Sequence, residues 1–213
     1  MPGSAEEGRA LMMDWIRAQD PRSVLDVGAG SGTYGKLCRA QLDDCYLIGL
    51  EVWRPYLRRF DLSAVYDLVL HRDVRNMALD EWPRVDIVIL GDVLEHMSEV
   101  DAVRVWNLAR ASAHKAVYLS IPIIHYPQGH EEGNPFEEHI VPDWNHDRVL
   151  ATFSGITWHW QGTIVGRYEA ARPGAPVLVH TAVGADTASR NSITGSVTGS
   201  VVQAGNIDGG LSL

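Results

Sequence analysis

The sequence predicts an α/β fold, in which a doubly wound and mostly parallel sheet has helices on both faces. Short apolar runs suited to buried strands recur along the chain, as at 24–27 and 85–90. Helical segments separate these runs, as at 33–40 and in the stretch that follows Ser98. A glycine-rich turn joins the first run to the next helix, which is typical of the nucleotide-binding corner of such sheets.

The composition and net charge of the chain exclude some classes of function and partner. The 213 residues suffice for one α/β domain with a sizeable core, and 46% apolar with 21% charged residues is ordinary for a soluble protein. A net charge of −9 argues against a duplex nucleic-acid partner. Cys38 and Cys45 fit no metal or disulfide framework. With no signal-peptide pattern and no apolar run of membrane-span length, we expect a cytoplasmic protein.

The glycine turn distinguishes among nucleotides. An acid and three glycines alternate with other residues, at Asp26, Gly28, Gly30 and Gly32. A dinucleotide-binding turn would need G-x-G-x-x-G, but Thr33 stands where its third glycine belongs, and no G-K-[ST] phosphate loop follows. The pattern closely resembles motif I of the class I S-adenosylmethionine-dependent methyltransferases. That resemblance extends over about residues 5–171 and disfavours a nicotinamide oxidoreductase.

This resemblance implies a Rossmann-like, seven-stranded sheet in which a C-terminal β-hairpin supplies an antiparallel strand. We expect a methyltransferase domain over 1–173. A leading helix around Trp15 precedes the first strand, and Ser98 caps the helix after the fourth strand. The remaining segments are expected as strands at 46–50, 66–71, 85–90 and 115–121, helices at 54–62 and 145–153, and two strands within 156–171 that meet near Gln161.

The resemblance also assigns the cofactor S-adenosylmethionine to particular residues. Glu51 ends the second strand, where a carboxylate accepts hydrogen bonds from both ribose hydroxyls. Asp73 and Val74 follow the third strand, at the position where the family contacts adenine. Asp26 is expected to help hold the methionine ammonium. The full expected set is Asp26, Gly28, Ala29, Gly30, Gly32, Glu51, Val52, Asp73, Val74, Asp92 and Val93.

Methyl transfer to an oxygen or amine of a small molecule needs a proton acceptor that works near neutral pH, and histidine suits that range. His125 is the first candidate and His96 the second. Each is alternatively a structural histidine in the cleft wall. The sequence favours a sugar or secondary metabolite as substrate, with protein and nucleic-acid methylation left open. The expected substrate residues are His125, Tyr126, Glu131, His139 and Trp144.

The segment 124–148 is unusual because it is rich in histidine and acids, while glycine and proline interrupt regular structure. A long loop beyond the carboxyl end of a strand suggests a lid or binding loop. Some ubiquinone-biosynthesis O-methyltransferases bind a metal through E-x-x-x-E-H. Glu95 and His96 match the end of that pattern, but Gly91 occupies its first acid position, so we expect no metal.

The last segment, 174–213, is a low-complexity stretch of Gly, Ser, Thr and Val. It resembles short repeat tails of actinobacterial proteins, and the segment 124–144 resembles uncharacterised phage and actinobacterial methyltransferases. The tail is either a flexible end or a β-forming segment that mediates self- or hetero-association. A second hypothesis for the whole protein is therefore a cofactor-binding assembly or sensing module with little catalysis.

Overall fold

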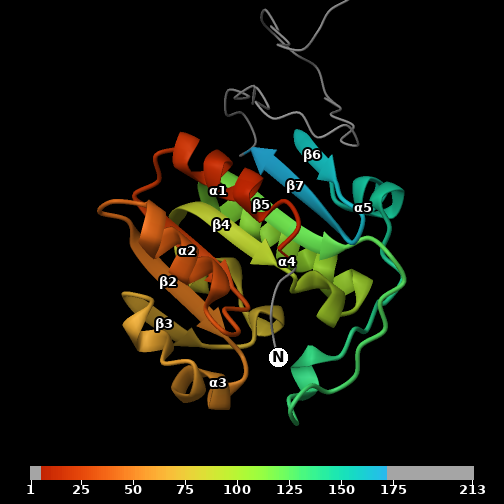
Figure 1. The fold of residues 1–213 in the computed structure, drawn as a ribbon, viewed down its shortest axis with the longest axis horizontal. Helices are drawn as coiled ribbons and strands as arrows, with labels where there is room; N and C mark the ends of the chain where they lie inside the picture. Colours follow the sequence, from red (N-terminus) through yellow and green to blue (C-terminus); the bar gives the residue numbers. More distant parts are fainter. Residues whose placement is uncertain (1–5, 172–213) are drawn as a thin grey trace, which may run out of the picture.

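A computed structural model describes residues 6–171 of the chain, so the predicted tail lies outside the described residues. Seven strands form one sheet in the order β3-β2-β1-β4-β5-β7-β6 (Figure 1). The strands are β1 (Ser23–Val27), β2 (Tyr46–Glu51), β3 (Leu68–His71), β4 (Val85–Gly91), β5 (Ala113–Pro122), β6 (Trp158–Gln161) and β7 (Val165–Ala171).

Strands β1 to β5 pair in parallel, whereas β7 is antiparallel to both β5 and β6. The chain order reverses direction between β1 and β4, which is the switch point at which open α/β sheets bind ligands. The sheet therefore confirms the predicted Rossmann-like fold, including the hairpin strand inserted next to β5.

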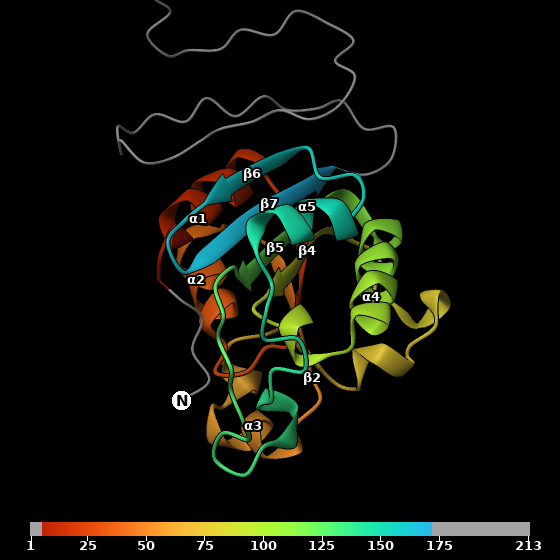
Figure 2. The same cartoon turned by 90° about the vertical axis from the view of Figure 1, so that its right-hand side faces the viewer.

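The helices are α1 (Arg9–Ala18), α2 (Thr33–Gln41), α3 (Arg54–Arg59), α4 (Glu99–Ser112) and α5 (His146–Thr152). Figure 2 shows α1 and α2 on one face of the sheet and α4 on the other. Ser98 caps α4 by accepting a hydrogen bond from the Asp101 amide, as predicted. None of the described helices has the length and apolar character that a membrane span requires.

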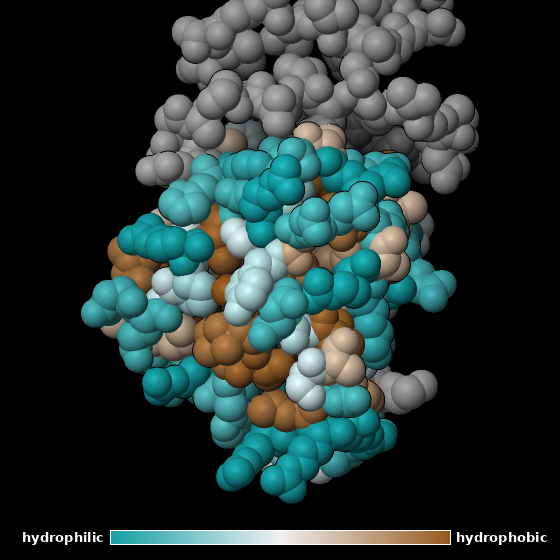
Figure 3. Space-filling view, turned by 90° about the vertical axis from the view of Figure 1, so that its left-hand side faces the viewer, coloured by the Kyte–Doolittle hydropathy of each residue, from teal (hydrophilic) through white to brown (hydrophobic). Residues whose placement is uncertain are grey.

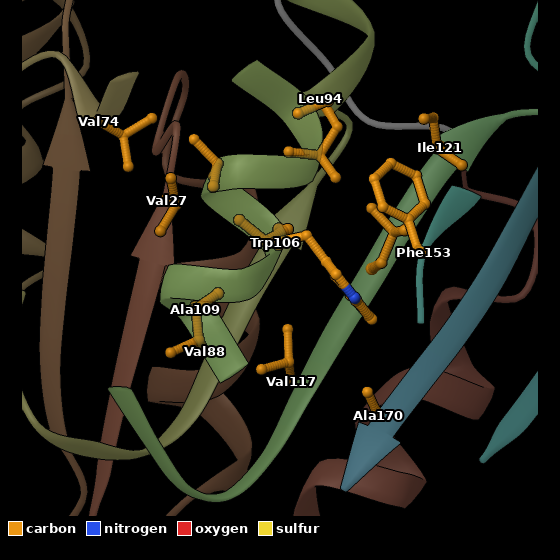
Figure 4. Close-up of a cluster of buried hydrophobic side chains, with 14 of the residues drawn as sticks. Val27, Val74, Val88, Leu94, Trp106, Ala109, Val117, Ile121, Phe153 and Ala170 are labelled. Carbon is orange, nitrogen blue, oxygen red and sulfur yellow. The ribbon is translucent and has the colours of Figure 1, made fainter. Parts of the chain in front are cut away.

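The sheet is buried because apolar side chains cover both faces. On the α4 side, Trp106 and Ala109 pack over Val88 and Val117 of the central strands (Figure 4). On the other side, Trp15 and Ile16 of α1 belong to a second buried cluster. This double burial explains why the central strands are almost continuously apolar in sequence.

Two predicted elements are shorter in the structure. The helix expected over 54–62 ends at Arg59, because Asp61 adopts a left-handed conformation with φ 45°. The strand expected over 66–71 begins at Leu68. The ring of Tyr66 instead packs against β2 at Gly49, which has no side chain to occupy this space. A Cβ at Gly49 would lie 2.8 Å from Tyr66 Cδ2.

The sheet has β6 at one edge and, at the other, β3, which has four residues. Figure 3 faces the side of the molecule that carries this edge, and apolar surface gathers near the middle of that view. Leu68 is 40% exposed. A strand this short offers few unpaired backbone groups, which limits pairing with another chain.

The segment between β5 and α5 is a long loop, as predicted, with one 3-10 turn, η5 (Pro135–Glu137). It runs from β5 to the region of α3 and returns to α5 (Figures 1 and 2). The Arg59 guanidinium pairs with Glu132, and the rings of Trp53 and Phe136 lie 6.1 Å apart. These contacts hold the loop against the carboxyl ends of the parallel strands.

Candidate active site

A cavity of about 350 Å³ lies at the carboxyl ends of the parallel strands, beneath this loop. Every parallel strand contributes to its wall, through residues at or just after its end. Examples are Gly28 after β1, Glu51 on β2, Asp73 after β3, Asp92 after β4 and Pro122 on β5. Its size lies in the range of small-molecule and cofactor sites.

The glycine turn forms one wall of the cavity. Gly28 and Gly30 have φ of 72° and 53°, a left-handed conformation that favours glycine. A Cβ at Gly28 would lie 2.8 Å from Val93 Cγ2, so a side chain there would collide with the residue that follows β4. Ala29 also lines the cavity. Gly32 instead caps α2, with φ 75°, and is not among the cavity-lining residues.

Glu51 lies at the centre of the wall and is 4% exposed. Its Oε2 accepts a hydrogen bond from the Gly30 amide at 2.8 Å, and its Oε1 accepts one from the Trp53 amide at 2.6 Å. Burial raises the pKa of Glu51, although these backbone donors oppose the shift. Each oxygen retains a lone pair, so the carboxylate can still accept hydrogen bonds from a ligand.

Asp26, expected to contact the cofactor, lies below the turn and is not among the cavity-lining residues. It is 2% exposed, and Tyr66 donates a hydrogen bond to its Oδ2 at 2.5 Å. Burial raises its pKa to about 7 against the opposing effect of this hydrogen bond. Asp26 is therefore held in the protein interior, near the end of β1. Its role toward the methionine ammonium stays a prediction.

Asp73, Val74 and Val52 also line the cavity, and the predicted contact of Asp73 and Val74 with adenine stays a prediction. Asp73 accepts hydrogen bonds from the side chain of Arg75, with Nε to Oδ1 at 2.9 Å and Nη2 to Oδ2 at 2.7 Å. Burial raises the pKa of Asp73, but the Arg75 hydrogen bonds outweigh it and lower the pKa overall. The Arg75 guanidinium lies 5.5 Å from the centre of the Phe136 ring.

Asp92 and Val93 also line the cavity, directly after β4. Asp92 has φ 54°, an unusual conformation for a residue other than glycine and one that concentrates at functional sites. The Ser120 hydroxyl donates to its Oδ1 at 2.7 Å. Its buried Oδ2 has no hydrogen-bond partner among the described residues. The left-handed turn thus places Asp92 in the cavity wall, with its carboxylate against Ser120.

Glu95, His96 and His139 form a cluster in the cavity wall, with ligand atoms all within 4.8 Å of one another. Glu95 and His96 belong to the 3-10 turn η4 (Leu94–His96), and His139 comes from the long loop. The histidine ring centres are 4.8 Å apart. Burial lowers the pKa of His96 to about 4 and lowers that of His139, whereas it raises that of Glu95 well above its usual range. Both shifts favour the neutral form of the imidazole.

The expected substrate residues divide into two groups. Tyr126 and His139 line the cavity. His125, Glu131 and Trp144 are not among the cavity-lining residues. His125 has a side chain 67% exposed, and its Nδ1 lies 2.5 Å from Asp143 Oδ1. Glu131 pairs with Asn134 in a β-bridge, and Trp144 is 2% exposed in the core.

Sequence reasoning missed some residues that line the cavity, among them Arg75, Asn134, Phe136 and Glu137. Three of these belong to the long loop, where no periodicity marks which side chains face inward. Arg75 directly follows the predicted adenine-contacting pair, so its position in the sequence was the available signal.

The turn between β6 and β7 lines the opposite side of the cavity through Ile164 and Val165. Glu7 fixes this turn: its carboxylate accepts hydrogen bonds from the amides of Thr163 at 2.7 Å, Ile164 at 2.8 Å and Val165 at 3.1 Å. Burial would raise the pKa of Glu7, but these hydrogen bonds outweigh it and lower the pKa to about 2. The N-terminal segment therefore helps to shape the site.

No protein-family model and no curated protein sequence matches this chain. Among solved structures, the N-terminal domain of EvdMO1 with S-adenosylhomocysteine bound is similar, at 16% identity and a TM-score of 0.59 over 79% of this chain and 82% of that one. Magnesium protoporphyrin IX methyltransferase from Synechocystis PCC 6803, also with bound S-adenosylhomocysteine, is similar at 16% identity and a TM-score of 0.55. The match covers 76% of this chain and 81% of that one.

Human N-acetylserotonin methyltransferase in complex with S-adenosylmethionine is similar at 11% identity and a TM-score of 0.57. The match covers 78% of this chain and 51% of that one. At such identities the likeness concerns the fold, and it confirms the fold expected from the glycine turn.

Proposed function

We propose that this protein is an S-adenosylmethionine-dependent methyltransferase that modifies an oxygen or nitrogen atom of a small molecule. The observation that carries the proposal is the buried carboxylate of Glu51 at the centre of a cavity bordered by the Gly28–Gly30 turn. The chain shares its fold with solved methyltransferases that bind this cofactor or its product.

The residues present fit the cofactor. The free lone pairs of Glu51 suit the two ribose hydroxyls, because a carboxylate accepts two hydrogen bonds side by side. Gly28 has no Cβ, and a side chain there would collide with Val93 of the same wall. Val74 and Phe136 offer apolar surface for an adenine ring. When bound, S-adenosylmethionine supplies an electrophilic methyl group.

The protein's own contribution is to align the acceptor atom and remove its proton. We assign the proton acceptor to the cluster of Glu95, His96 and His139 rather than to His125. The support for this choice is that His96 and His139 line the cavity and that burial lowers the pKa of both, which favours the neutral imidazole. The side chain of His125 is 67% exposed and does not line the cavity. The unpaired Oδ2 of Asp92 lies in the same wall.

The substrate we favour is a sugar or a hydroxylated secondary metabolite. Gln128, Asn134 and Glu137 bring amide and carboxylate groups of the loop to the cavity wall, and such groups pair with hydroxyls. The similar EvdMO1 domain has also been crystallised in the presence of S-adenosylhomocysteine and D-fucose. Gln128 and Asn134 also hydrogen-bond to Glu137 within the loop, so a substrate with several hydroxyl groups would meet a preformed polar wall.

Calorimetry tests the cofactor assignment. We expect S-adenosylmethionine and S-adenosylhomocysteine to bind with micromolar affinity, about −8 kcal/mol, and NAD to show no binding. A panel of hydroxylated small molecules, screened by release of S-adenosylhomocysteine, then tests the reaction. Failure of the folded protein to bind either sulfur compound would overturn the proposal.

A further inference from the structure

The cluster of Glu95, His96 and His139 holds a feature that methyl transfer does not explain. Glu95 is 1% exposed, and within residues 6–171 neither of its carboxyl oxygens has a hydrogen-bond partner. An unpartnered polar group in the interior is costly, so nearly all such groups in folded proteins are satisfied by a protein atom, a water or an ion. Both histidine rings lie beside this carboxyl.

The orientation of the two rings points to a cation. His96 Nδ1 lies 3.2 Å from the Glu138 carbonyl oxygen, and His139 Nδ1 lies 2.6 Å from the Tyr126 carbonyl oxygen. Because a carbonyl only accepts, each Nδ1 carries the proton and each Nε2 keeps its lone pair. Metal-binding histidines characteristically donate their other N–H to a backbone carbonyl or a carboxylate in this way.

We propose that Glu95, His96 and His139 bind one divalent transition-metal ion, through a carboxylate oxygen of Glu95 and the Nε2 atoms of both histidines. Three protein ligands of this kind leave coordination positions open, as catalytic zinc sites do. Because the cluster lines the cavity, those open positions face the space available to a substrate.

The donor set indicates which metal binds. Two imidazole nitrogens and one carboxylate suit Zn²⁺, Co²⁺, Mn²⁺ or Fe²⁺, whereas Mg²⁺ prefers oxygen ligands alone. This set of ligands also differs from the E-x-x-x-E-H pattern. Gly91 stands at the position of the first acid of that pattern, and the third ligand, His139, comes from the long loop. A bound metal ion would therefore connect the long loop, through His139, to the turn η4, through Glu95 and His96.

If the proposed function holds, the metal-bound cluster would activate the acceptor through the ion instead of taking the proton itself. A hydroxyl oxygen of the acceptor would bind the ion, which would lower the pKa of that hydroxyl as such ions do for bound water, and its proton would pass to Asp92 in the same wall or to water. The remaining open position suits a second, neighbouring oxygen. We therefore infer a chelating acceptor, such as a vicinal diol. The metal site itself does not depend on the identity of the reaction.

The experiment uses tag-free full-length protein stripped with a chelator. We expect calorimetry to show one Zn²⁺ and one Co²⁺ bound per chain, with Mg²⁺ far weaker, and Co²⁺ to give the visible absorption of a nitrogen- and oxygen-ligated ion. Glu95→Gln and His139→Gln should each weaken Zn²⁺ binding by at least ~100-fold, since losing even an outer partner of a ligand costs 10–100-fold.

His125→Gln is the matched control, because it removes a histidine of the same loop that lies outside the cavity wall; it should bind Zn²⁺ like the wild type. Circular dichroism checks that every variant is folded. Zn²⁺ affinity unchanged in both Glu95→Gln and His139→Gln would overturn the site. Parallel titration with S-adenosylhomocysteine separates the two proposals, since metal binding without nucleoside binding refutes the proposed function alone.

Discussion

Glu51→Gln is the substitution that most directly tests how the cavity binds a nucleoside. The side chain is 4% exposed and keeps its shape in the variant, so the change affects charge and hydrogen bonding rather than volume. Both wild-type oxygens accept backbone N–H groups, from Gly30 and Trp53. The amide nitrogen of glutamine cannot accept, so one of these donors would face another donor.

The expected loss follows from these hydrogen bonds. A hydrogen bond to a charged group contributes about 1.5–3 kcal/mol, and a neutral one about half as much. Replacing the carboxylate removes at least one such bond to a ribose hydroxyl and weakens the other. We therefore expect S-adenosylhomocysteine to bind at least tenfold more weakly, a loss of about 1.4 kcal/mol or more.

Calorimetry with two ligands separates ribose recognition from damage to the turn. The wild type should discriminate strongly between S-adenosylhomocysteine and its 2′-deoxy analogue, and Glu51→Gln should lose most of that discrimination. Glu99→Gln, an exposed change on α4, is the control. If Glu51→Gln weakened both ligands by the same factor, the carboxylate would act through the glycine turn and the reasoning on ribose would be refuted.

Three further predictions concern residues that lie in the cavity wall or behind it. Glu7→Gln should lower the free energy of unfolding at pH 7 by about 1–2 kcal/mol. Because the pKa of Glu7 in the folded protein is held at about 2, the stability that its carboxylate contributes is present above pH 4.5 and is lost as the pH falls toward 2. Urea unfolding of the wild type and the variant should therefore show a larger difference at pH 7 than at pH 3. Tyr66→Phe should lower the free energy of unfolding by about 1–3 kcal/mol, and by more at pH 8 than at pH 5. The reason is that the pKa of Asp26 is about 7, so that at pH 8 the variant loses the stronger hydrogen bond from Tyr66 to an ionised carboxylate. An equal loss of unfolding free energy at both pH values would contradict this. Phe136→Ala should weaken S-adenosylhomocysteine binding about fivefold, near 1 kcal/mol, measured against Ile140→Ala, an exposed change in the same loop that should have no effect.

Much of the fold could be predicted because its signals are local. An alternation of glycines after a β-branched run specifies a strand, a left-handed turn and a helix, and these appear as β1, Gly28 to Gly32 and α2. The acid at the end of the second strand lies in the cavity wall, since the carboxyl ends of parallel strands meet at one edge of the sheet. The boundary errors at Arg59 and Leu68 arose where a left-handed Asp61 and the tertiary contact of Tyr66 overrode the local pattern.

The sequence by itself determined the central strands and helices, because strand and helix periodicities record which face of each element is buried. The resemblance carried by the glycine turn implied the seven-stranded sheet and the acidic and glycine positions of the cavity. Only the tertiary structure decided which side chains of the long loop face inward. That loop has no periodicity, and its path depends on contacts such as Arg59 with Glu132 and Trp53 with Phe136. It brings His139 to Glu95 and His96, leaves His125 exposed and buries Trp144, and no local spacing distinguishes these outcomes.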